Sequence, residues 1–190
     1  MIITIARECG SGGTPIGKKL AERYNLPLYD MQRVVEIGTE NGVFDEHPEF
    51  FSEQPLDTLM SALAFTTNKA KIHQFAKDML SKLLPEDNFI LVGRCGNAVY
   101  RDHKDCFCIF LCGDFEDRVA YMQNTFNLSR KAAEAKVKEV DENRASYHSY
   151  YTGETWKKAN HYDLCLNTSR LGLEQTEKVI AAFIDTARRK

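Results

Sequence analysis

A glycine-rich segment near the amino terminus has the composition of a phosphate-binding loop. It reads Gly10-Ser11-Gly12-Gly13-Thr14-Pro15 and follows a short apolar run, Ile2–Ala6, that is typical of a buried strand. An amphipathic helical pattern begins directly after it. Small residues between a strand and a helix let backbone N–H groups turn toward an anion, which the helix amino terminus also favours. The segment therefore predicts a phosphate site; the alternative is a tight turn without a ligand.

This loop lacks the lysine that phosphate-binding loops normally carry. A literal match to the lysine-containing pattern ends at Lys18. However, Thr14 is a good helix N-cap and proline is favoured at the first helical position, so we expect the helix to begin at Pro15. Lys18 would then lie inside the helix. In that register the loop runs from Arg7 to Thr14, with Gly13 in the place of the lysine and Thr14 in that of the magnesium-ligating hydroxyl.

Composition excludes several classes of function. The chain has 190 residues, with 25 basic and 27 acidic side chains and a net charge of −2, so it lacks the basic surface of a general nucleic-acid binder. No apolar run approaches the length of a membrane span. None of the six cysteines forms a C-x-x-C pair, which argues against zinc. We expect a reduced, cytoplasmic protein that binds neither nucleic acid nor membrane.

The fold class follows from five short apolar runs that helical patterns separate. The predicted strands are Ile2–Ala6, Leu26–Tyr29, Phe89–Val92, Cys106–Leu111 and Asp163–Leu166. Alternating strands and helices are typical of an α/β protein with a doubly wound, five-stranded parallel sheet.

Two excursions are longer than a simple crossover between parallel strands requires. The first holds a helix over Met31–Ile37, an aromatic stretch Phe44–Phe51 and two further helices, of which the second carries an apolar stripe from Ile72 to Leu83. The other follows the fourth strand and contains a helix capped by Ser129. We expect one domain over 1–190. Its core would comprise 1–30 and 86–190, its helical insertion 31–85, and its lid about 127–160.

Five segments, in this order, resemble the bacterial cytidylate kinases: the glycine loop with Leu28-Tyr29-Asp30, then Val92-Gly93-Arg94, then Asp141–Ala145, then Asp163–Ser169, then the helix that carries Leu173-Glu174-Gln175. The sequence is most similar to the divergent cytidylate kinase-like branch, which shares a Gly-Ser-Gly-Gly loop without the lysine. The resemblance covers nearly the whole chain. It implies a P-loop kinase fold with a helical insertion and a lid. It also implies transfer of a phosphoryl group from ATP, with Mg²⁺, to a nucleoside monophosphate or a similar small acceptor.

The resemblance also implies roles for individual residues. The loop residues 10–14 would bind the ATP phosphates, and Thr14 would ligate Mg²⁺ as well. Phosphoryl transfer depends on positive charge around the migrating group, so another cation must replace the lysine. Arg7 is the first candidate and Lys18 the second. Further candidates on the lid side are Arg118, Arg130 and Arg144, of which Arg144 falls on the family's Asp-x-x-Arg pattern.

The acceptor is expected over the helical insertion. The resemblance places Asp30 at the opening of the acceptor site, and Arg33 and Arg94 are natural contacts for its phosphate or base. Ligands bind at the carboxyl ends of strands in open α/β sheets, and Asp30 follows a predicted strand. The alternative for Asp30 is that it caps the helix that begins at Met31.

Some positions depart from the family pattern. Cys95 follows Gly93-Arg94 where cytidylate kinases carry an acidic residue, and Glu142 lies where the lid would carry another arginine. A degenerate nucleotide-binding sensor or regulator without turnover is therefore the rival hypothesis, and a kinase for a non-nucleotide acceptor is the third. Cys9 is either a reactive thiol or a packing residue, and Tyr147 and Tyr151 either stack on a base or join the lid to the core.

Overall fold

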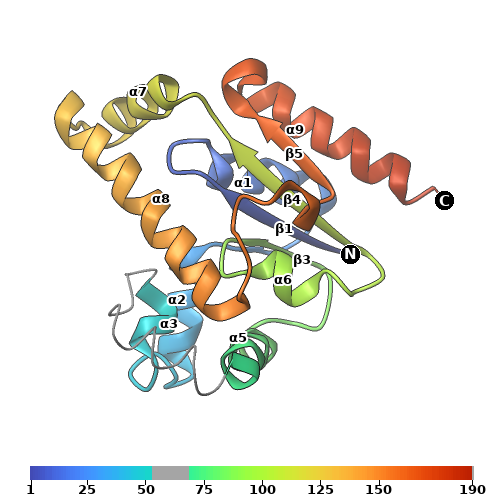
Figure 1. Ribbon diagram of the computed structural model, residues 1–190. Coiled ribbons are helices and arrows are strands. Elements are labelled where there is room, and N and C mark those ends of the chain that lie inside the picture. Colours follow the sequence, from blue (N-terminus) through green and yellow to red (C-terminus); the bar gives the residue numbers. More distant parts are fainter. Residues whose placement is uncertain (53–68, 190) are drawn as a thin grey trace.

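The computed structural model describes residues 1–52 and 69–189 (Figure 1). In chain order its elements are β1 (Ile2–Arg7), α1 (Gly13–Tyr24), β2 (Leu28–Tyr29), α2 (Met31–Glu40), α3 (Pro48–Ser52), α5 (Lys69–Leu83), β3 (Phe89–Val92), α6 (Gly96–Tyr100), β4 (Cys106–Cys112), α7 (Phe115–Phe126), α8 (Arg130–Thr152), a 3₁₀ turn (Ala159–His161), β5 (Leu164–Asn167) and α9 (Thr168–Ala187). Within the described ranges, none of the helices has the length and apolar character needed to cross a membrane.

The strands form one parallel sheet in the order β2-β3-β1-β4-β5. The central strand β1 is buried along its whole length, as its unbroken apolar run predicts. Ile5 pairs with Val92 of β3, and Arg7 pairs with Leu111 of β4, so these three strands end at the same edge of the sheet. The predicted doubly wound α/β fold is confirmed, and the carboxyl ends of β1, β3 and β4 meet where a ligand is expected.

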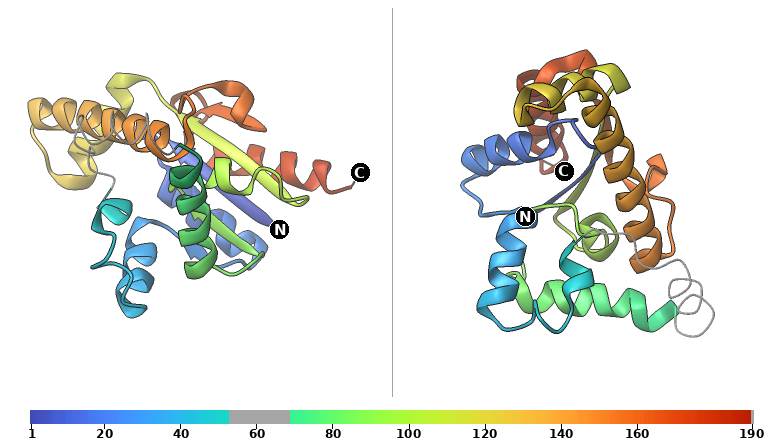
Figure 2. Two further views of the ribbon diagram at one scale, coloured as in Figure 1. Left: turned by 60° about the horizontal axis from the view of Figure 1, so that its bottom comes forward. Right: turned by 90° about the vertical axis from the view of Figure 1, so that its left-hand side faces the viewer.

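One face of the sheet packs against α1 and α9. Successive strand residues point to opposite faces. Ile3 and Ile5 of β1 share a buried cluster with Ile16 and Leu20 of α1 and Ile180 of α9, all with no exposed surface. Figure 2 shows α1 and α8 on opposite sides of β1. The apolar spacing of the first helix therefore fixes α1 against the sheet and brings its amino terminus to the end of β1.

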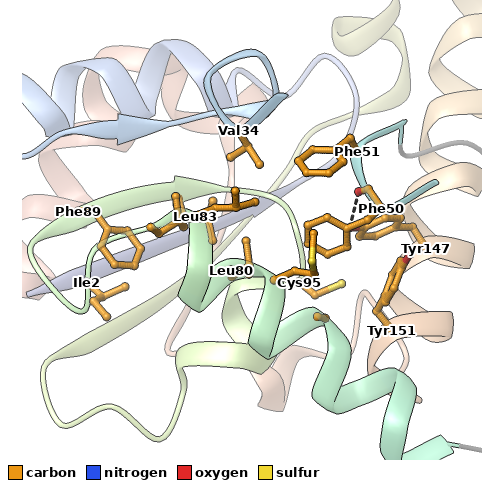
Figure 3. Close-up of a cluster of buried hydrophobic side chains, with 14 residues drawn as sticks. Ile2, Val34, Phe50, Phe51, Leu80, Leu83, Phe89, Cys95, Tyr147 and Tyr151 are labelled. Carbon is orange, nitrogen blue, oxygen red and sulfur yellow. Dashed lines mark hydrogen bonds between the residues drawn. The ribbon is translucent and has the colours of Figure 1, made fainter. Parts of the chain in front are cut away.

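The opposite face packs against α3, α5 and α8. Phe50 of α3 is fully buried, and its ring contacts those of Phe75, Tyr147 and Tyr151. The Tyr147 hydroxyl donates to the Phe50 carbonyl at 2.9 Å (Figure 3). Of the two sequence-based interpretations of the tyrosines, the contact between lid and core is therefore the one realised.

The first helix begins two residues earlier than predicted. Gly12, with a φ of 79°, is the N-cap of α1, and no side-chain hydrogen bond caps the helix. The first helical bond runs from the Ile16 N–H to the Gly12 carbonyl at 3.0 Å. Thr14 and Pro15 are thus the second and third helical residues, and the prediction that Thr14 is the N-cap is wrong. Glycine reaches this left-handed conformation at little cost, so the chain enters the helix as soon as the loop ends.

Other differences from the prediction lie away from the loop. Helix α6, directly after β3, was not expected, and a short helix, α3, lies within the predicted aromatic stretch. The last helix is interrupted at Gly172, whose φ is 71°. The helix predicted between Phe51 and Ile72 lies outside the described residues.

Candidate active site

The glycine loop is built by the end of β1 and the start of α1. The Glu8 N–H donates to the Leu111 carbonyl at 2.9 Å, which prolongs the β1–β4 pairing by one residue before the chain turns. Gly10 and Gly12 both have a φ of 79°. A Cβ on Gly10 would lie 2.6 Å from the Arg118 carbonyl oxygen. Glycine is therefore required at position 10 both for its conformation and for the close approach of the loop to α7.

A cavity of about 490 Å³ lies between this loop and helices α7 and α8. Its lining combines backbone of the loop, cations and apolar side chains of the two helices: Arg7, Glu8, Cys9, Gly10, Gly12, Gly13, Thr14, Pro15, Lys18, Tyr121, Met122, Phe126, Val140 and Arg144. The structure thus brings together most of the loop residues predicted to bind nucleotide and three of the five predicted cations, Arg7, Lys18 and Arg144. Ser11 is buried, and its hydroxyl donates to the Glu8 carbonyl at 2.8 Å.

Arg7 and Arg144 lie between this cavity and a second, much smaller one. The Arg144 guanidinium donates to the Arg7 carbonyl at 3.2 Å, which ties α8 to the end of β1. Both arginines also line a cavity of about 20 Å³ near the end of β3, together with residues that include Arg94, Asn97 and His148. Two positively charged side chains therefore stand at the junction of the two cavities.

Another predicted cation, Arg118, holds the loop in place. It is buried, and its guanidinium donates to the carbonyls of Gly113 and Cys9 at 3.0 and 3.2 Å. It also pairs with Asp141 of α8 at 2.7 Å. The arginine therefore joins the end of β4, the glycine loop and α8 at one point.

Two carboxylates complete this network beside the loop. Asp141 accepts the Cys9 N–H at 2.7 Å, and Glu8 accepts the Gly113 N–H at 3.1 Å. The Lys157 ammonium, from the segment after α8, pairs with Glu8 and lies 3.8 Å from Asp141. Two acidic and two basic side chains thus pair with one another beside the loop. Glu8 lines the cavity together with the cations Arg7, Lys18 and Arg144.

Arg94 lies at the end of β3 in a fully buried position. Its guanidinium donates to the carbonyls of Phe50 and Phe51 at the end of α3, and it stacks 5.6 Å from the centre of the Tyr147 ring. A helix carboxyl end favours a cation, so these contacts fix α3 to the sheet. Figure 3 shows Phe50 and Tyr147 side by side above Cys95, the residue that follows Arg94.

The other predicted acceptor residues lie on α2. The Asp30 carboxylate accepts the Arg33 N–H at 3.1 Å, so the capping alternative for Asp30 is realised. The Arg33 side chain is 46% exposed and pairs with Glu36 and Glu40 at 3.1 and 3.6 Å. On the lid, Arg130 is similarly exposed and pairs with glutamates on α7 and α8, at 2.6 and 2.7 Å. The structure does not bring these side chains into the lining of either cavity.

Burial shifts the pKa values of two side chains near the site. Cys9 is buried, with its Sγ 3.8 Å from the Met122 sulfur, and burial raises the pKa of its thiol. A raised pKa disfavours the reactive thiolate, which supports the packing role. Burial also lowers the pKa of His148 to about 4, so the imidazole is neutral at pH 7.

Sequence reasoning missed Glu8, Lys157 and Asp141 as parts of the site. Glu8 follows Arg7 at a predicted strand end, so the sequence could have predicted that Glu8 lies beside the site. Asp141 lies one helical turn before Arg144, which puts both on the same face of α8. Lys157 follows no motif, and only the fold reveals that it reaches a residue 149 positions away.

The sheet order, the glycine loop and the cavity above it define the class: this is an α/β protein with the fold of the P-loop kinases. The chain belongs to the cytidylate kinase-like family, whose model matches residues 2–170. The resemblance drawn from the sequence is therefore confirmed. Family and fold together support a kinase-like function that uses a nucleotide.

Individual relatives agree with this assignment. The cytidylate kinase of Pyrobaculum islandicum is 25% identical over 190 residues, which cover 98% of this chain and 94% of that protein. An uncharacterized protein from Eubacterium ventriosum has a similar structure, with a TM-score of 0.73 and 24% identity over 97% of this chain and 98% of that one. Shikimate kinase from Bacteroides thetaiotaomicron matches with a TM-score of 0.54 and 13% identity, over 97% and 98% of the two chains. The two structural matches show the shared fold.

Proposed function

We propose that the protein transfers the γ-phosphoryl group of ATP to a nucleoside monophosphate that resembles cytidylate, or to a similar small acceptor. The observation that carries this proposal is the position of Arg7 and Arg144, which line both the large cavity beside the glycine loop and the small cavity beyond it. A donor on one side and an acceptor on the other would present the migrating group to both guanidinium ions. Catalysis of this reaction rests mainly on such positioning and charge.

The glycine loop fits the phosphates of ATP. Gly10, Gly12 and Gly13 line the cavity at the amino terminus of α1, where the first N–H groups of a helix have no partner within the helix and favour an anion. The cavity of about 490 Å³ also has apolar side chains, Tyr121 and Phe126 of α7, that suit a base or ribose. We assign residues 10–14 to the phosphates and Lys18 to a supporting charge from the first turns of α1.

The residues present also fit Mg²⁺, with Thr14 as the protein ligand. Thr14 lines the cavity, and because no side chain caps α1, its hydroxyl is not used in capping. Magnesium characteristically takes few protein ligands and completes its shell with phosphate oxygens and water. Bound there, the ion would neutralise charge on the phosphates.

The chemical step is an in-line displacement at phosphorus. The acceptor oxygen forms a bond to the γ-phosphorus while the bond from that phosphorus to the bridging oxygen breaks, and ADP leaves with the bonding electrons. A phosphate oxyanion acceptor has no proton to lose, and a hydroxyl acceptor releases its proton to solvent. Arg7 and Arg144 stabilise the charge on the transferring oxygens, while Arg118 acts through the loop that it positions.

On the acceptor side the proposal keeps Arg94 and gives Asp30 and Arg33 a structural part. The cavity beside Arg94 holds only about 20 Å³, enough for a single water molecule. An acceptor anion would therefore take the place of the Phe50 and Phe51 carbonyls on the guanidinium, with a shift of α3. Asp30 caps the start of helix α2 by accepting the Arg33 N–H, and α2 is the helix that precedes α3 in the chain.

A nucleotide-binding sensor without turnover is the second candidate. The carboxylates of Glu8 and Asp141 are already paired with Lys157 and Arg118, which leaves them poorly placed to assist a metal ion. This observation favours binding without catalysis. A sensor would bind Mg·ATP and release no ADP with any acceptor.

The test is the ADP released by the purified protein with Mg·ATP and each member of a panel of nucleoside monophosphates and small hydroxyl acceptors. We expect ADP release that depends on one acceptor class. Arg144→Ala should abolish turnover, a loss of about 10³-fold or more, because a single arginine at the transferring group contributes that much. Arg130→Ala, an exposed arginine on the same helix, is the matched control and should leave the rate unchanged.

A further inference from the structure

Gly13 is a glycine because of its surroundings, not because of its own conformation. It is the first residue of α1 and adopts ordinary helical geometry, which any residue can take. A Cβ at this position would lie 2.6 Å from Cγ of Arg7, 3.0 Å from its Cβ and 3.3 Å from its Cδ. The side chain of Arg7 therefore fills the space that a side chain at position 13 would need.

The collision cannot be relieved by a small movement of Arg7. The atoms concerned are the first three of the side chain, so they move only if the whole side chain or the backbone moves. The backbone is fixed, because Arg7 pairs with Leu111 of β4 and its carbonyl accepts a hydrogen bond from Arg144. The side chain is only 8% exposed. A residue larger than glycine at position 13 must therefore displace Arg7.

We propose that Arg7 and position 13 are alternative sources of the same charge and exclude each other. In this loop the phosphate-binding cation comes from the end of β1, and Gly13 is the space that admits it. A lysine at position 13 would bring one cation into the cavity and expel another. This inference rests on the proposed function for its ligand, the phosphate groups of Mg·ATP, but its steric part does not depend on any ligand.

The exchange changes the kind of phosphate contact that the loop makes. A guanidinium is planar and donates two parallel hydrogen bonds to one anion, whereas an ammonium acts as a point charge. Arg7 also lines the small cavity beyond the loop, so a cation placed there faces both sides of the junction. We infer that Arg7 contacts the transferring phosphoryl group itself.

Four proteins test the exchange: the native chain, Arg7→Ala, Gly13→Lys and the double variant. The equilibrium affinity for Mg·ATP is measured for each. Arg7→Ala should weaken binding about 10- to 100-fold, the loss of one or two charge-assisted hydrogen bonds. Gly13→Lys should weaken it as well, although it adds a positive charge. The double variant should bind at least 10-fold better than either single variant.

Two results would overturn the proposal. One is Gly13→Lys binding Mg·ATP as well as the native chain or better, since the lysine would then enter without the cost of displacing Arg7. The other is a double variant no better than Arg7→Ala, since the lysine would then not replace the arginine. Arg130→Ala serves as the control for simple loss of a positive charge and should bind normally.

A second measurement separates this inference from the proposed function. Gly13→Ala adds only the Cβ, so it should lower the thermal unfolding midpoint by several degrees in the absence of nucleotide. Adding Arg7→Ala should recover most of that loss, because it removes the two atoms at 2.6 and 3.3 Å. An unchanged midpoint in Gly13→Ala would refute the steric argument. A native chain that binds no Mg·ATP would refute the proposed function and leave this coupling intact.

Discussion

The pair of Asp141 and Arg118 gives the sharpest test of how the loop is held. Their side chains are 13% and 9% exposed, and the Arg118 Nη1 lies 2.7 Å from the Asp141 Oδ2. The other oxygen of Asp141 accepts the Cys9 N–H of the loop. The change Asp141→Asn keeps the shape of the side chain and removes its charge.

The expected loss of stability follows from what is left behind. Arg118 would remain buried beside Glu8, which lies 3.4 Å away and also serves Lys157. Removing one partner of a buried pair costs about 3–5 kcal/mol, and the remaining Glu8 and two carbonyl contacts reduce that here to about 2–4 kcal/mol. For a domain of this size, about 1 kcal/mol shifts the unfolding midpoint by about 2–4 °C. We therefore expect a midpoint lowered by about 4–16 °C.

Urea unfolding and a thermal scan measure this difference, with a double-mutant cycle using Arg118→Met to isolate the pair. The matched control is Glu134→Gln on the same helix. It breaks the exposed pair with Arg130, whose side chains are 61% and 32% exposed, and should cost less than about 1 kcal/mol. If Asp141→Asn proved no more destabilising than Glu134→Gln, the claim that this pair fixes the loop would be refuted.

Three further predictions concern other contacts of the site. The pKa of His148 is lowered from 6.5 to about 4 by burial, so the unfolded chain binds its proton first as the pH falls. Stability should be full above pH 6.5 and decline toward pH 4, by about 3 kcal/mol in all, and urea unfolding of His148→Gln should lack that slope. Gly10→Ala should abolish Mg·ATP binding, measured at equilibrium, because its Cβ meets the Arg118 carbonyl oxygen at 2.6 Å. Arg94→Met should destabilise the fold by about 2–4 kcal/mol in urea unfolding, because it leaves the Phe51 carbonyl without the guanidinium and the Phe50 carbonyl with the Tyr147 hydroxyl in its place. A loss below about 1 kcal/mol would contradict the conclusion that Arg94 fixes α3 to the sheet.

Periodicity and loop chemistry in the sequence predict most of the fold. The run Ile2–Ala6 is apolar without alternation because β1 is buried on both faces, and that property is local to the strand. The stripe that includes Ile16 and Leu20 places α1 on the sheet for the same reason. The start of α1 was harder to predict, because Thr14 and Pro15 satisfy the rules for a cap that Gly12 satisfies two residues earlier.

The site was less predictable because its charges pair across long distances in the sequence. Arg118 was expected at the reacting group, yet its partners Asp141 and Cys9 make it part of the support for the loop. Arg94 also pairs with distant residues, because its guanidinium donates to carbonyls of α3. The apolar periodicity of the sequence does not predict that short helix. The position of Arg7 beside the cavity was predictable, since it lies at a strand end just before the glycine loop. The space that it fills above Gly13 becomes visible only in three dimensions.

The most direct test of the central claim follows the γ-phosphoryl group itself. The purified protein is incubated with Mg²⁺ and ATP labelled at the γ-phosphorus, with each nucleoside monophosphate in turn, and the products are separated. The proposed function predicts label on one acceptor class, formed by the native chain and by Arg130→Ala but not by Arg144→Ala. Tight binding of ATP with no labelled product from any acceptor in the panel would contradict it and support a sensor.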